Sequence, residues 1–131
     1  MNRIIVLGCG YLGYNIADYL LEKGSSVQIL GLNSFYVEYI SEYFLEMDVF
    51  DLQQLEKVNF EEAIVIDCLM LISPNKTYEN EDDVLSSFLK RYTMLYEFLQ
   101  DKKISRYITF SSGGTIYGDV ATKAKETDYV Q

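Results

Sequence analysis

The stretch Ile4-Ile5-Val6-Leu7-Gly8-Cys9-Gly10-Tyr11-Leu12-Gly13 runs from four apolar residues into a glycine-rich turn. A short apolar run of this kind predicts a buried strand. From Tyr11 to Lys23 the apolar residues recur at helical spacing, and Gly24 follows where a helix C-terminus favours glycine. The sequence therefore predicts a strand, a tight turn and a helix, with an inward helix face formed by Leu12, Ile16, Ala17, Leu20 and Leu21.

The three glycines of this turn, Gly8, Gly10 and Gly13, have the spacing G-x-G-x-x-G. The first allows a tight turn, the second lets a pyrophosphate approach the backbone, and the third lets the helix pack close to the strand. The N-terminus of the helix adds free N–H groups and the positive end of the helix dipole. The stretch thus predicts a dinucleotide site, and a purely structural turn is the alternative.

The composition bounds the class of protein. The 131 residues, 49% of them hydrophobic, suffice for one domain with a buried core. A net charge of −9 argues against a nucleic-acid or anionic-membrane partner. Because the chain has no histidine, it has no His-based triad and no His metal ligand, and no metal site is expected.

The location expected from the sequence is cytoplasmic. No apolar run approaches the ~18 residues of a membrane span, and Met1-Asn2-Arg3 leads directly into a strand without a signal-peptide pattern. Cys9 and Cys68 form no C-x-x-C pair and suit a reducing compartment, so both are expected to stay reduced.

Further strands are predicted at residues 26–30, 43–47, 63–69 and 106–110, with helices at 35–42, from Asp51 to Val58, and at 82–102. Strands that alternate with helices predict a doubly wound parallel sheet, here in the order 3-2-1-4-5. Ligands of such sheets bind outside the carboxyl ends of the strands, where the strand order reverses. The loops expected there are 8–13, 31–34, 48–49, 68–72 and 111–115.

Two helices carry predictions about packing. In residues 35–42 we expect Phe35, Tyr39 and Ile40 to face inward. The long helix has one apolar side that should pack on the sheet, formed by Leu85, Phe88, Leu89, Tyr92, Tyr96 and Leu99. A second apolar set lies partly off that side, namely Val84, Leu95 and Phe98. This predicts a homodimer or larger assembly through residues 84–103 or the fifth strand, unless residues 119–131 cover that strand.

The segment Phe110-Ser111-Ser112-Gly113-Gly114-Thr115-Ile116-Tyr117-Gly118-Asp119 resembles the S-S-x-x-x-x-Y-G segment of extended short-chain dehydrogenases/reductases, the NAD-dependent epimerase/dehydratase family. The resemblance covers the whole chain and includes the opening glycine motif. It implies a Rossmann-like fold, NAD or NADP as cofactor with NAD favoured, and a nucleotide-sugar substrate for the full-length protein.

The resemblance also implies roles for residues at the ends of the strands. An acid after the second strand usually holds the adenine ribose, and its position here is Gly31, so NAD and NADP are not distinguished. Asp48 matches a residue near the adenine amine, with Val49 on the ring, although Asp48 could simply be an acid that ends a strand. The residues expected to bind the dinucleotide are Gly8, Gly10, Tyr11, Leu12, Gly13, Asp48, Val49, Cys68, Leu69 and Ser111.

For catalysis the family uses a Tyr-x-x-x-Lys pair and a Ser or Thr that binds the substrate hydroxyl. We expect the pair to be absent, since the fourth residue after Tyr117 is Ala121 and not a lysine. Ser112 or Thr115 could supply the hydroxyl. Residues 1–131 are therefore interpreted as a single, partial cofactor-binding domain, inactive by itself. A non-catalytic NAD(P)-binding or sensor protein and a Rossmann-like domain with an empty site are the alternatives.

Overall fold

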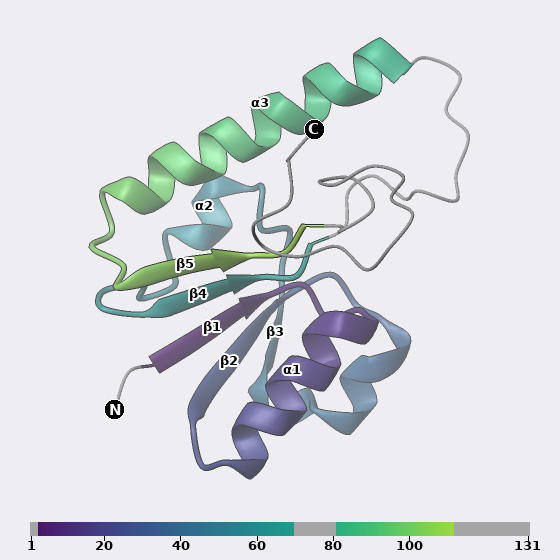
Figure 1. The fold of residues 1–131 in the computed structure, drawn as a ribbon, viewed down its shortest axis with the longest axis vertical. Coiled ribbons are helices and arrows are strands. Elements are labelled where there is room, and N and C mark those ends of the chain that lie inside the picture. The colour runs from purple at the N-terminus through teal and green to yellow at the C-terminus, as the bar shows by residue number, and fades with distance from the viewer. Residues whose placement is uncertain (1–2, 70–80, 112–131) are drawn as a thin grey trace, which may run out of the picture.

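The computed structural model describes residues 3–69 and 81–111, which form a parallel sheet between two helical layers (Figure 1). The strands are β1 (Arg3–Leu7), β2 (Ser26–Gly31), β3 (Phe44–Glu46), β4 (Ile64–Asp67) and β5 (Arg106–Thr109). They lie side by side in the order β3-β2-β1-β4-β5, and every neighbouring pair is parallel. The predicted fold class and strand order are confirmed.

The helices are α1 (Tyr11–Glu22), α2 (Leu52–Leu55) and α3 (Glu81–Gln100), with two short 3-10 helices, η1 (Phe35–Tyr39) and η2 (Ser41–Tyr43). In Figure 1, α1 and the two 3-10 helices cover one face of the sheet, and α2 and α3 cover the other. Each face has its own apolar cluster. The first contains Val6, Cys9, Ala17, Val27, Ile29, Ile40 and Ile66. The second contains Ile5, Leu7, Leu30, Met47, Val49, Leu55, Phe60, Ala63, Val65, Tyr92, Leu95 and Leu99.

The register of the central strands determines which residues meet at the carboxyl edge of the sheet. Leu7, the last residue of β1, pairs with Leu30 on one side and with Asp67 on the other. The loops that follow β1, β2 and β4 therefore leave the sheet at one level. This is the edge at which ligands of doubly wound folds bind.

Helix α1 ends as predicted but presents a narrower inward face. Gly24 has φ +83°, and its N–H donates to the carbonyl oxygen of Leu21 at 3.0 Å. Gly13 and Ala17 are the fully buried residues of the helix. Leu12, predicted to face inward, is exposed. The small side chains at the centre of the face let the helix lie close to the sheet, so a leucine in the first turn falls outside the contact.

Residues 35–42 form 3-10 turns in place of the predicted helix, and this changes the inward face. Ile40 is buried as predicted, but Phe35 is 71% exposed and Tyr39 is also exposed. A 3-10 helix has three residues per turn, so the residues that reach the sheet are Tyr36, Val37 and Ile40. The prediction for Phe35 and Tyr39 assumed the wider α-helical spacing and was wrong.

Helix α3 contacts the core through its C-terminal half. Tyr92 and Leu99 are buried as predicted, while Leu85, Leu89 and Tyr96 are exposed. Leu95, predicted to lie partly off the core face, is only 1% exposed. The N-terminal end of α3 reaches beyond the tips of β4 and β5 in Figure 1. Its first turns therefore have no sheet beneath them, and residues 92, 95 and 99 define the packed face.

Helix α2 is shorter than predicted. Asp51 caps it as expected, because its Oδ1 accepts a hydrogen bond from the N–H of Gln53 at 3.1 Å. The helix ends at Leu55, and the following residues turn.

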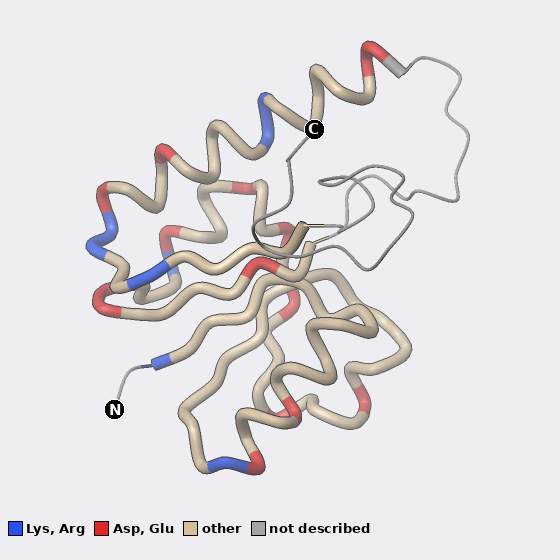
Figure 2. Tube along the Cα trace, in the orientation of Figure 1, with Lys and Arg blue, Asp and Glu red and all other residues tan. Residues whose placement is uncertain are grey.

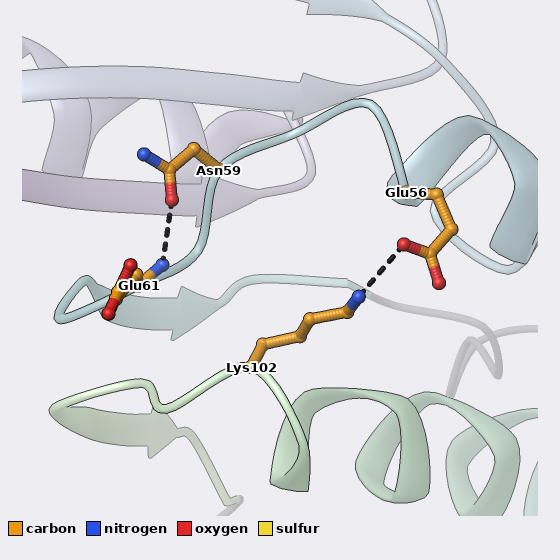
Figure 3. Close-up of polar contacts among 4 residues, drawn as sticks. All are labelled: Glu56, Asn59, Glu61 and Lys102. Atoms are coloured by element: carbon orange, nitrogen blue, oxygen red, sulfur yellow. Dashed lines mark hydrogen bonds and ion pairs between the residues drawn. The ribbon is translucent and has the colours of Figure 1, made fainter.

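Two polar contacts lie in the segment after α2 (Figure 3). Nζ of Lys102, just after α3, lies 2.8 Å from Oε2 of Glu56. The side chain of Asn59 accepts a hydrogen bond from the N–H of Glu61. Both charged side chains are partly exposed, so the ion pair contributes little to stability.

Candidate functional site

The glycine turn connects β1 to α1 in a conformation that requires glycine at Gly8. Its φ is +96°, a region that L-residues rarely adopt. Its N–H donates to the carbonyl oxygen of Leu30 at 2.7 Å. A Cβ at this position would lie 3.0 Å from the carbonyl oxygen of Cys68. The turn is thus fitted closely between the ends of β2 and β4.

Gly13 and Gly10 have opposite surroundings. A Cβ on Gly13 would lie 2.0 Å from the carbonyl oxygen of Gly8, so no larger residue fits unless the helix moves. A Cβ on Gly10 would meet nothing within 4 Å. The fold therefore requires glycine at position 13, whereas at position 10 the absence of a side chain leaves open space above the turn.

The N-terminus of α1 borders that open space. Gly10 is its N-cap residue and, having no side chain, caps none of the N–H groups of the first turn. The first N–H groups of a helix lack partners within the helix and carry the positive end of its dipole. The site can therefore accept an anionic group.

Charge is absent from two stretches of chain on this side of the molecule. Residues 4–17 and 24–37, which form β1, most of α1, β2 and the loop after β2, contain no Asp, Glu, Lys or Arg. Figure 2 shows this region of the tube without charged residues, in a chain whose net charge is −9. These two stretches therefore place no negative charge beside the glycine turn, and the acid at this edge, Asp67, is buried at the end of β4 next to Leu7.

The loop after β2 is fastened to the glycine turn. Gly31 is buried, and a Cβ there would lie 3.3 Å from the Cα of Gly8, so a larger residue would press on the turn. The hydroxyl of Ser34 donates to the carbonyl oxygen of Cys9. Ser34 also accepts from the N–H of Tyr36 at 3.3 Å, which starts η1. Sequence reasoning placed Ser34 in this loop but did not identify its role, since nothing in the sequence indicates its contact with Cys9.

Aromatic rings form the rim beside the turn. Tyr14 of α1 stacks on Tyr36 with centroids 5.3 Å apart and planes at 17°. Tyr11, at the start of α1, and Phe35 each contact Tyr36 edge-on, at 6.3 and 5.3 Å, and both are exposed. The rim therefore offers flat apolar surface next to the open space above Gly10.

Asp48 and Val49, which follow β3, have structural roles in addition to the ligand contacts that the sequence suggested. Oδ1 of Asp48 accepts from the N–H of Phe50 at 2.9 Å, which is the turn role considered as an alternative. Asp48 is exposed and has its second carboxylate oxygen for another partner. Val49 is buried in the cluster beneath α2 and α3, which leaves it little surface for a ligand.

Cys68 and Leu69 form the wall of the turn on the β4 side. The N–H of Cys68 donates to the carbonyl oxygen of Leu7 at 2.9 Å. Burial, and then the neighbouring charge of Asp67, raise the pKa of the Cys68 thiol to about 11. Burial also raises the pKa of Cys9, and both cysteines are free in the structure. Both thiols are therefore protonated at neutral pH.

Asp67 is the residue of this edge that sequence reasoning missed. It is the last residue of β4 and only 4% exposed. It accepts hydrogen bonds from the hydroxyls of Tyr92 at 3.3 Å and Tyr107 at 2.5 Å. Burial and these contacts with Asp67 raise the pKa of both tyrosines. The sequence did contain a signal that could have identified it, namely an acid at the end of an otherwise apolar strand.

The predicted catalytic residues Ser112 and Thr115 lie outside the described residues. Ser111, predicted to contact the dinucleotide, is described and exposed just after β5.

The predicted absence of the spacing Y-x-x-x-K was wrong, since Tyr19 and Lys23 have it. They lie at the C-terminal end of α1, with Nζ of Lys23 5.4 Å from the centre of the Tyr19 ring, and both are exposed. Because the glycine turn is at the other end of the helix, this pair is not in a catalytic position.

In residues 3–69 and 81–111, no group of three or more His, Cys, Asp or Glu side chains could hold a metal ion. Among the helices that the structure describes, none combines the length and the apolar character that a membrane crossing requires.

Comparison with known families identifies the class of protein. The NAD dependent epimerase/dehydratase family matches residues 4–130, nearly the whole chain. The chain belongs to this family, as its glycine turn and serine segment predicted. A search of curated proteins found no match.

Solved structures show the same fold. The UDP-glucose 4-epimerase of Thermotoga maritima, solved with UDP-glucose, is 24% identical with a TM-score of 0.77, and the match covers 100% of this chain and 45% of that one. The UDP-glucuronic acid 4-epimerase of Bacillus cereus, a mutant solved with a fluorinated UDP-sugar and NAD, is 15% identical with a TM-score of 0.73, covering 98% and 46%. WbmG of Bordetella bronchiseptica, solved with NAD and UDP, is 17% identical with a TM-score of 0.66, covering 98% and 43%. The chain spans less than half the length of each.

Proposed function

We propose that residues 1–131 form one NAD(P)-binding domain of an enzyme that acts on a nucleotide sugar. The observation that carries this proposal is the glycine turn, with its obligatory Gly8 and Gly13 and its open Gly10. Membership of the epimerase/dehydratase family supports it. Similar structures solved with NAD and with UDP or a UDP-sugar support the choice of ligands.

The pyrophosphate of the cofactor would lie over Gly10 at the N-terminus of α1. Backbone N–H groups of Tyr11, Leu12 and Gly13 would face its oxygens, and residues 4–17 and 24–37 add no negative charge that would repel it. The nicotinamide half would extend towards Cys68, Leu69 and Ser111. When bound, the nicotinamide would supply hydride chemistry, and these residues would orient its ring.

The adenosine half would lie towards β2 and β3. Asp48 and the exposed rings of Tyr11 and Phe35 are the groups available there, with Val49 behind them. Gly31 supplies neither the carboxylate that selects the ribose of NAD nor the arginine that selects the phosphate of NADP. We infer that the site takes both cofactors, and that NAD is the natural one because similar structures were solved with NAD.

Catalysis would require groups that this chain does not bring to the glycine turn in its described part. Tyr117 has no lysine four residues later, and the Tyr19–Lys23 pair lies at the wrong end of α1. We infer that the chain binds the cofactor without turning over a nucleotide sugar, and that Ser112 or Thr115 contributes in the longer enzyme.

The test of the proposed function uses Gly10→Val. A side chain there meets no protein atom within 4 Å, so the variant should stay folded and lose at most about 1 kcal/mol of stability through its poorer N-cap residue. The branched side chain would occupy the place of the pyrophosphate, so calorimetry should detect NAD binding to the original chain and none to the variant. Equal binding by both chains, or no binding of NAD or NADP at millimolar concentration by either, would refute the proposal.

A further inference from the structure

Asp67 is a buried carboxylate held by donors from three parts of the fold. Its Oδ1 accepts from the N–H of Leu69 at 2.9 Å and from the hydroxyl of Tyr92, which comes from α3. Its Oδ2 accepts from the hydroxyl of Tyr107, which comes from β5. A buried charge is costly unless it is hydrogen-bonded, and an apolar residue would fill the end of β4 without that cost. Its three hydrogen bonds therefore offset the cost of burying an acid at the end of β4.

The bond to Leu69 sets the course of the backbone after β4. An aspartate that accepts from the N–H two residues later closes a tight turn. This turn aims the carbonyl oxygen of Cys68 at Gly8, where it lies 3.0 Å from the position that a Cβ would take. The side chain of Leu69 would also lie 3.4 Å from a Cβ on Gly8. The Cβ of Cys68 would lie 3.4 Å from a Cβ on Gly13. Residues 67–69 thus support the glycine turn from behind.

The two tyrosines extend this support outward. Tyr92 and Tyr107 both pack around Tyr96, with centroids 5.4 and 5.3 Å from its ring, but only Tyr92 and Tyr107 donate to Asp67. Through one carboxylate, α3 and β5 are connected to the turn between β1 and α1. A packing contact alone would not fix the direction of the backbone in this way, because hydrogen bonds to a carboxylate are directional.

We propose that Asp67 is a positioning residue of the cofactor site, which holds residues 67–69 against Gly8 and Gly13 so that the turn is ready for the pyrophosphate. This inference rests on the proposed function for its ligand. It makes the affinity for NAD depend on a side chain that the ligand does not touch, and on two hydroxyls from α3 and β5.

The experiment compares Asp67→Ala, Asp67→Asn and Asp51→Ala. Asp51 is the matched control, since it makes the same bond to an N–H two residues later but lies at the start of α2. Affinity for NAD is measured by calorimetry, and hydrogen exchange of the Gly8 and Leu69 amides by NMR. We expect Asp67→Ala to weaken binding about tenfold or more and to speed exchange at both amides. Asp67→Asn, whose carbonyl oxygen can still accept from Leu69, should restore affinity to within about threefold, and Asp51→Ala should leave it unchanged.

Affinity within twofold of the original chain in a folded Asp67→Ala, or an equal loss in Asp51→Ala, would overturn the inference. If Asp67→Ala does not fold, the double variant Tyr92→Phe/Tyr107→Phe replaces it, with Tyr96→Phe as its control, and only the double variant should weaken binding. If the original chain binds no dinucleotide, the proposed function fails by itself. The inference is then decided by exchange at Gly8, and a rate that Asp67→Ala leaves unchanged would contradict it.

Discussion

Gly13 lies so close to Gly8 that a Cβ on Gly13 would come within 2.0 Å of the carbonyl oxygen of Gly8. Helix α1 can rest on the turn only because that Cβ is absent. The contact fixes the height of the helix N-terminus above the end of β1. It therefore makes the shape of the candidate site a consequence of core packing.

Gly13→Ala should destabilise the fold strongly. The added methyl group must push α1 away from the turn, which we expect to cost about 3 kcal/mol or more of the free energy of unfolding. Gly10→Ala is the control, because its Cβ meets no protein atom within 4 Å, and it should cost less than about 1 kcal/mol. Urea unfolding followed by circular dichroism gives both values. Similar losses for the two variants would mean that the close contact does not exist in solution.

Cofactor selectivity should be weak and should respond to Gly31. We expect dissociation constants for NAD and NADP within about tenfold of each other, because residues 24–37 carry no charge. Gly31→Asp should shift the ratio towards NAD by about tenfold, since a carboxylate repels the additional phosphate of NADP. The tight contact with Gly8 will weaken both affinities, so Gly31→Ala is the control for size. The ratio is measured by calorimetry, and an unchanged ratio in Gly31→Asp would place the adenosine ribose elsewhere.

Stability should fall at alkaline pH. The pKa of Cys68 is raised from 9.0 to about 11 in the folded chain, and burial also raises those of Tyr92 and Tyr107. The unfolded chain therefore releases these protons at lower pH than the folded chain does. The contribution of these groups to the free energy of unfolding is therefore fully present below about pH 9. It is lost as pH rises towards 11 for Cys68, and at higher pH for the tyrosines. Urea midpoints at pH 8, 9.5 and 10.5 should decrease, and less steeply in Cys68→Ala.

Alkylation should report the pKa of Cys68 directly. Only the thiolate reacts with iodoacetamide, so the rate at Cys68 should rise with pH up to about 11. Asp67→Asn removes a negative charge beside the thiol and should lower the midpoint of that rise. Peptide mapping distinguishes Cys68 from the more deeply buried Cys9. A midpoint near 9 in the original chain would show that the thiol is open to water.

Association in solution remains a prediction. Leu85 and Leu89 of α3 are exposed, and a groove of about 450 Å³ between α3 and β5 is lined by Tyr96, Leu99, Gln100, Lys103, Ile104, Tyr107 and Thr109. Exposed apolar surface of this kind favours a homodimer or larger assembly. Light scattering at tens of micromolar should give more than 15.2 kDa, and Leu89→Glu should restore a monomer. Phe98 is unsuitable for this test because it packs on Phe60 in the core. A monomeric original chain would remove the prediction.

Much of the fold could be predicted because it depends on local patterns. The alternation of apolar strands and helices determined the sheet order, and the spacing of three glycines located the turn. The faces of η1 and α3 could not be predicted, because they depend on which residues have a sheet beneath them. Asp67 was missed for a related reason, since its partners Tyr92 and Tyr107 are 25 and 40 residues away along the chain. Its role exists only in the folded protein.

The bond from Ser34 to Cys9 determines more than the position of a loop. The carbonyl of Cys9 and the N–H of Gly10 belong to one trans peptide, in which these two groups point in opposite directions. Because Ser34 draws the carbonyl towards the loop after β2, it turns the N–H of Gly10 away from that loop. Ser34 thus sets the orientation of a whole peptide plane. By binding the carbonyl of Cys9, its hydroxyl also fixes the direction of the Gly10 N–H, which it does not contact.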